Sequence, residues 1–156
     1  MALLTGINQV FTGDTTTVDT TAQYTLGTRA RGVDGNEYIY LKGVASTVLG
    51  SWVTFDELGV TTLLVANAIG PVAVAMAIID STSEYGWYCV YGTCEACIAA
   101  NATADTAIGF ETTSGYAGDG KAAGDVISGA VLRDTTTDAA VVTVQINYPY
   151  VDDNSN

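Results

Sequence analysis

The stretch at residues 139–148, AAVVTVQINY, decides the fold class of this chain. In an extended chain every second side chain shares a face, so one face would carry Val142, Val144, Ile146 and Tyr148. The other face would carry Val141, Thr143, Gln145 and Asn147. This alternation is typical of a β-strand with one buried face. We expect the strand to end at Pro149, because proline cannot donate a hydrogen bond to a neighbouring strand.

Similar short strands, separated by turn signals, precede this stretch. The dipeptide Asp34-Gly35 between two β-prone runs predicts a hairpin. Further strands are expected at residues 51–55, 61–66, 71–80, 85–91, 106–112 and 125–133. Gly92 would close the aromatic strand, residues 93–100 would form a short Ala-rich segment, and Gly129 would mark a bulge. We therefore expect an all-β fold, a sandwich or barrel of short antiparallel strands.

The alternating residues also predict the hydrophobic core. The run at residues 71–80 is apolar on both faces, which favours a strand buried in the middle of the sheet. The expected core residues are Val72, Val74, Met76, Ile78, Trp87, Val142, Val144 and Ile146.

The composition limits the classes of partner. The chain has 156 residues, enough for one domain with its own core. Its net charge is −12, from 17 acidic and 5 basic residues, so we expect it to bind neither nucleic acid nor an anionic membrane surface. The N-terminus lacks the basic and apolar regions of a signal peptide, which predicts synthesis in the cytoplasm.

The first residues differ from the rest in composition. Residues 1–22 are rich in Thr and show no sustained period, whereas residues 23–150 contain the predicted strands and residues 151–156 form a polar tail. Residues 1–22 are either a disordered tail or an extended arm that orders on a partner. The candidate contact residues of the arm are Leu3, Leu4, Ile7, Val10 and Phe11.

The chain offers little to an enzyme mechanism. It contains no histidine, which removes the commonest general base and the commonest zinc ligand. Cys89, Cys94 and Cys97 are one ligand short of a structural zinc site, and we interpret them as buried thiols that fill space. The acidic pairs at residues 56–57 and 152–153 are expected in solvated turns rather than in a hydrolase site. We therefore expect no enzyme activity, no cofactor and no metal.

Three segments resemble a known family. They are the hairpin GTRARGVDGNEYIYLKG at residues 27–43, the aromatic strand EYGWYCVYG at 84–92 and the segment DVISGAVL at 125–132, followed by the closing alternating strand. In this order they resemble small capsid decoration (cement) proteins of tailed bacteriophages, over roughly residues 23–148. The cluster formed by Cys89, Cys94 and Cys97 is not a feature of that family pattern.

The resemblance implies a virion structural protein on the outer capsid surface, made in the host cytoplasm. Such a protein would bridge subunits of the major capsid protein and assemble as a homotrimer. The alternative is a carbohydrate-binding or adhesive β-sandwich module of a phage fibre, because exposed Tyr and Trp side chains can bind sugars. The candidate aromatics are Tyr24, Tyr38, Tyr40, Trp52, Tyr85, Trp87, Tyr88, Tyr91, Tyr116, Tyr148 and Tyr150.

Overall fold

The computed structural model describes residues 10–11, 13–120 and 125–152, and within these ranges it contains strands and no helix. The strands are β1 (Val10–Phe11), β2 (Arg29–Gly32), β3 (Glu37–Lys42), β4 (Trp52–Phe55), β5 (Thr61–Leu63), β6 (Gly70–Ala75), β7 (Tyr85–Ile98), β8 (Ala107–Phe110), β9 (Ala117–Gly118), β10 (Val126–Leu132) and β11 (Ala140–Val151). They are joined in one mixed sheet in the order β1-β2-β3-β7-β9-β8-β10-β11-β6-β4-β5. The predicted all-β class is confirmed, and the choice between a sandwich and a barrel stays a prediction.

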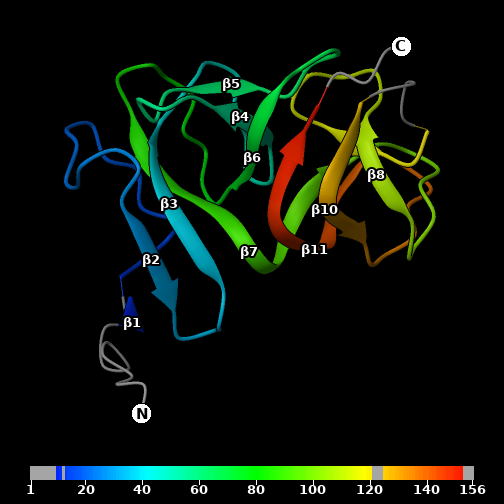
Figure 1. Cartoon of the computed structure of the whole chain (residues 1–156), viewed down its shortest axis with the longest axis horizontal. Helices are drawn as coiled ribbons and strands as arrows, with labels where there is room; N and C mark the ends of the chain where they lie inside the picture. The colour runs from blue at the N-terminus through cyan, green and yellow to red at the C-terminus, as the bar shows by residue number, and fades with distance from the viewer. Residues whose placement is uncertain (1–9, 12, 121–124, 153–156) are drawn as a thin grey trace.

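Strand β7 connects two groups of strands (Figure 1). In the first group β3, β7, β6, β4 and β5 pair in succession, and a bridge between Lys42 and Val60 brings the end of β3 beside the start of β5. In the second group β7 pairs with β11, followed by β10, β8 and β9, and Ile98 of β7 pairs with Ala117 of β9. The first group therefore begins at β3 and returns to it through the Lys42–Val60 bridge. The second group begins at β7 and returns to it through the pairing of Ile98 with Ala117.

The central strands of the first group are buried on both faces. Ile39 and Leu41 of β3 belong to the smaller core cluster, whereas Tyr38 and Tyr40, on the opposite face, belong to the larger one. In β6 the same division separates Ala73 and Ala75 from Val72 and Val74. The prediction that the strand at residues 71–80 is central is thus confirmed for its first half.

The predicted core is confirmed in five of its positions and wrong in one. Val72, Val74, Trp87, Val144 and Ile146 are each at most 3% exposed. Met76 and Val142 are partly buried and pack against the larger cluster. Ile78 is 61% exposed, because β6 ends at Ala75 and the alternation does not continue beyond it. In the segment that follows, Ala77 and Ile79 are buried instead.

Two expected strand ends are also wrong. β7 does not close at Gly92 but continues to Ile98, because a glycine with φ of 107° lets the strand bend and change partners from β3 to β11. β11 continues through Pro149 to Val151. Pro149 is tolerated because the ladder with β7 ends at Asn147 and the pairing with β6 begins at Tyr150, so its missing N–H is not needed.

The predicted hairpin and bulge are confirmed. β2 and β3 flank the Asp34-Gly35 turn, and Asn36 ties this turn to the bend of β7. Its amide donates to Thr93 O at 2.9 Å, and its Oδ1 accepts from Thr93 N at 2.9 Å. Gly129, with φ of 77°, lies at the register shift between Ser128 and Ala130. The irregular points of the strands are thus held by specific contacts.

Candidate functional site

The predicted arm meets the sheet at its first edge. Val10 and Phe11 form β1, which pairs in parallel with Arg31 and Gly32 of β2. Figure 1 shows β1 beside β2, and in the strand order of the sheet β1 is the first strand and β5 is the last. The other three candidate contact residues, Leu3, Leu4 and Ile7, lie outside the described residues. Of the five, the structure therefore places two, and both are in the edge strand.

Contacts between the N-terminal segment and the body begin before the expected boundary at residue 22. Asp19 N donates to Tyr85 O at 2.9 Å, and Tyr85 N donates to Asp19 O at 2.8 Å. The Tyr40 hydroxyl donates to Asp19 Oδ2 at 2.6 Å. Burial and this carboxylate together raise the pKa of Tyr40 to about 12. Val18 packs against the smaller core cluster, so residues 18 and 19 are attached to the body independently of β1.

Exposed tyrosines gather where β11 passes β7 and β2. The rings of Tyr91 and Tyr148 lie 5.4 Å apart, and the guanidinium carbon of Arg29 is 5.7 Å from the Tyr148 ring centre, a cation–π contact. The Tyr148 hydroxyl donates to Glu37 Oε2, and this hydrogen bond raises the pKa of Tyr148. Tyr148 has φ of 45°, which is uncommon for a bulky residue. Such backbone strain is found preferentially at functional sites.

Two hollows continue from these tyrosines across the surface. The small hollow, of about 70 Å³, is lined by Arg29, Phe55, Pro71, Val72, Val90, Tyr148, Pro149 and Tyr150. The large hollow, of about 670 Å³, is lined by Thr54, Phe55, Asp56, Glu57, Val60, Thr62, Ile69, Gly70, Pro71 and Tyr150. Because Phe55, Pro71 and Tyr150 line both, the two form one surface, which we call the β2–β11 groove. It joins residues from six strands, β2, β4, β5, β6, β7 and β11, with residues of the β4–β5 turn and Ile69.

The two ends of the β2–β11 groove carry opposite charges. Arg29 lines one end, and Arg31 lies two residues further along β2, exposed like Arg29. Asp56 and Glu57 line the other end. Asp56 Oδ1 also accepts hydrogen bonds from Leu58 N and Val60 N, both at 2.9 Å, and so holds the turn. The predicted solvated turn is therefore correct for residues 56 and 57, which are both exposed.

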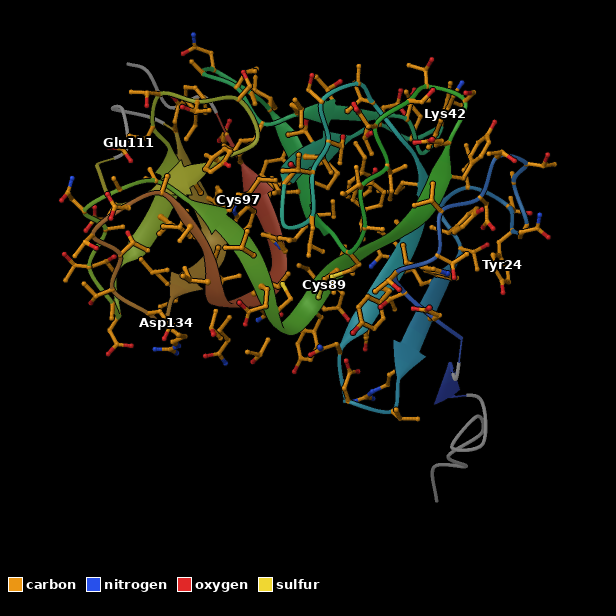
Figure 2. The ribbon with its side chains drawn as sticks, turned by 180° about the vertical axis from the view of Figure 1, so that it is seen from behind. Tyr24, Lys42, Cys89, Cys97, Glu111 and Asp134 are labelled. Atoms are coloured by element: carbon orange, nitrogen blue, oxygen red, sulfur yellow. The ribbon has the colours of Figure 1, made fainter. Side chains whose placement is uncertain are left out.

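The three cysteines are buried free thiols, and Figure 2 labels two of them, Cys89 and Cys97. Cys89 Sγ donates to Tyr91 O at 3.5 Å, and Cys97 Sγ donates to Leu49 O at 3.3 Å. A hydrogen bond with Cys89, together with burial, raises the pKa of the Cys94 thiol, and burial raises that of Cys97. In the part of the chain that the structure describes, no three His, Cys, Asp or Glu side chains are grouped to hold a metal ion.

The sequence did not predict the β2–β11 groove. The alternation places Tyr148 on the same strand face as Val144 and Ile146, but Tyr148 is 48% exposed, and Tyr150 is 45% exposed. The bend at Tyr148 turns the end of the strand away from β7, and a period of two residues cannot show such a bend. The motif Tyr-Pro-Tyr at residues 148–150 was the one available signal, because proline commonly marks irregular strand ends.

No family model matches the chain, and neither a curated protein nor a solved structure matches it. Among the described residues there is no helix of sufficient length and apolarity to cross a membrane.

Proposed function

We propose that this chain is a virion structural protein that decorates the outer surface of a tailed-phage capsid and bridges subunits of its major capsid protein. The observation that carries the proposal is the attachment of the N-terminal segment. It joins the sheet edge through a parallel pairing of two residues, while the body is held by its own cores. The family resemblance of residues 27–43, 84–92 and 125–132 points to the same class.

An edge strand of this kind suits a bridging protein. Two-residue pairings contribute few hydrogen bonds, each worth about 0.5–1.5 kcal/mol net. Such a strand can leave β2 or extend the sheet toward a neighbour at modest cost, as in recognition by strand addition. Residues 18 and 19 remain on the body when this happens, because their contacts with Tyr85 and Tyr40 do not involve β1. Many copies on one shell would add avidity to each weak contact.

The first test is whether the protein co-purifies with intact virions, and whether the isolated protein binds purified capsids. A variant with Val10→Pro and Phe11→Pro removes both β1 amide donors and should bind capsids more weakly. Its matched control is Thr15→Pro, because Thr15 lies at the second position of the turn closed by Thr17 N and Asp14 O, where proline is favoured. Absence of the protein from virions, or equal binding by both variants, would contradict the proposal.

A second candidate function is an adhesive or carbohydrate-binding module of a phage fibre. The exposed rings of Tyr91, Tyr148 and Tyr150 favour it, because sugars stack on aromatic faces. A glycan array separates the two functions. Tyr150→Ala should abolish glycan binding if this candidate is right. The control is Tyr24→Ala, which should keep it, because Tyr24 is equally exposed but lies outside the lining of the groove.

A further inference from the structure

The charge of the molecule restricts how two copies can touch. Each copy carries a net charge of −12, so most of its surface repels a second copy. The basic residues are Arg29, Arg31, Lys42, Lys121 and Arg133. Arg133 is paired with Asp105 at 2.6 Å, and Lys121 lies outside the described residues. Lys42 is half-buried, whereas Arg29 and Arg31 are both exposed on β2, where Glu37 of β3 lies opposite Arg31. Among the described residues these two arginines are the exposed cations that stand together, and Arg29 is the one that lines the groove.

The β2–β11 groove places that cationic site beside an apolar and an acidic one. Arg29 lines its small hollow, Asp56 and Glu57 line its large hollow, and Tyr150 lines both. Ile69, at 63% exposed, adds apolar surface to the large hollow. The order is therefore cation, aromatic ring, carboxylates along one continuous surface. Tyrosine and arginine are also the residues most enriched at the energetic centres of protein interfaces.

We propose that the β2–β11 groove is the contact between copies of this chain, with the Arg29 end of one copy against the Asp56–Glu57 end of the next. Every copy then uses both ends, and the rings between them exclude water from the contact. The inference rests on the proposed function, because it names the surface through which a decoration protein would self-associate. A neutral sugar could stack on the tyrosine rings but would form no ion pair with Arg29, Asp56 or Glu57. A second copy of the chain can contact both the rings and the charges, and for this reason we favour it as the partner.

The test is a charge exchange followed by sedimentation. The wild-type protein should sediment as a dimer or a trimer. Arg29→Glu and Glu57→Arg should each weaken association by roughly 100-fold, because each places like charges against one another. An equimolar mixture of the two variants should associate again, since the glutamate at position 29 then faces the arginine at position 57. The recovery should be complete in a two-fold dimer, and incomplete in a ring of three, which cannot alternate two variants.

Matched controls carry the same charge changes elsewhere. They are Arg133→Glu and Asp138→Arg, both exposed and outside the lining of the groove. Both controls should associate like the wild type, and thermal melts should show that all four variants fold.

Three results would overturn the inference: a monomeric wild-type protein at its highest soluble concentration, unchanged association of both groove variants, or a mixture that fails to recover. A monomer that binds a glycan through Tyr150 would assign the groove to the second candidate function. Virion binding is measured separately, so a failure here leaves the test of the proposed function intact.

Discussion

Replacing Gly92 with alanine should destabilise the whole fold, because Gly92 is where β7 bends between its two partners. Gly92 has φ of 107°, a region that side chains with a Cβ rarely adopt. A methyl group at this position would overlap Asn36 Oδ1, which is the acceptor for Thr93 N. The Asn36 side chain could move only by giving up its two hydrogen bonds to the Thr93 backbone.

The expected cost follows from these two effects. Backbone strain of this kind costs about 1–3 kcal/mol. The two lost hydrogen bonds cost about 0.5–1.5 kcal/mol each. Gly92→Ala should therefore lower the free energy of unfolding by about 4 kcal/mol, which for a chain of this size corresponds to a fall in Tm of roughly 10 °C. Urea titration and differential scanning calorimetry both measure this change.

The matched control is Gly27→Ala, which separates the two effects. Gly27 also has a positive φ, 84°, but a methyl group there would meet nothing within 4 Å. It should show the backbone cost alone. The double variant of Gly92→Ala with Asn36→Ala should lose less than the sum of the single changes, because the overlap is then removed. If Gly92→Ala and Gly27→Ala melt within about 2 °C of one another, the proposed lock between the hairpin turn and β7 is wrong.

Deleting residues 1–12 should leave the melting temperature almost unchanged. Deleting residues 1–22 should lower it, because the longer deletion removes Val18 and Asp19. Equal melting temperatures of the two deletion variants would contradict the attachment of these residues to the body. Tyr40→Phe should reduce the loss of stability at alkaline pH. The folded pKa of Tyr40 is raised to about 12, so its contribution is present below the unfolded value near 10 and is lost as the pH rises through 12, which pH-dependent urea titrations would show. Replacing the three cysteines with alanine should lower stability through small cavities but leave capsid binding intact, and stoichiometric zinc in the purified wild-type protein would show that their assignment as space fillers is wrong.

The strand pattern could be predicted wherever local chemistry decides the structure. The hairpin at Asp34-Gly35 and the bulge at Gly129 follow from the backbone freedom of glycine, and the structure contains both. The alternation of Val144 and Ile146 likewise reports a buried face. These features depend on residues close together in the chain, which is why a single sequence was sufficient.

The errors lie where a distant contact decides. Gly92 was expected to end a strand, but the Asn36 side chain and the pairing with β11 carry β7 through it. Ile78 was expected in the core, but the chain leaves the sheet after Ala75 and the alternation is lost.

The β2–β11 groove is the feature that could least be predicted from the sequence. The β2–β11 groove brings Arg29, Phe55 and Tyr150 together from strands far apart in the sequence, and only the sheet order shows that they meet. For Leu3, Leu4 and Ile7 the proposed contacts stay predictions. The sequence could supply the types of residue that such a contact needs, but not their neighbours.

The continuity of β7 has a mechanical consequence. A load on the N-terminal segment first meets the pairing of β1 with β2. It then meets the bridge between Asp19 and Tyr85, at the start of β7, which continues without interruption to its ladder with β11 and the second group of strands. The first attachment is the two-residue pairing of β1, whereas the next one combines the Asp19–Tyr85 bridge with the packing of Val18 against the smaller core cluster. Tension should therefore separate β1 from β2 before it deforms the body. If the N-terminal segment grips a partner, as proposed, movement of that partner would separate β1 from β2 reversibly and leave the body folded.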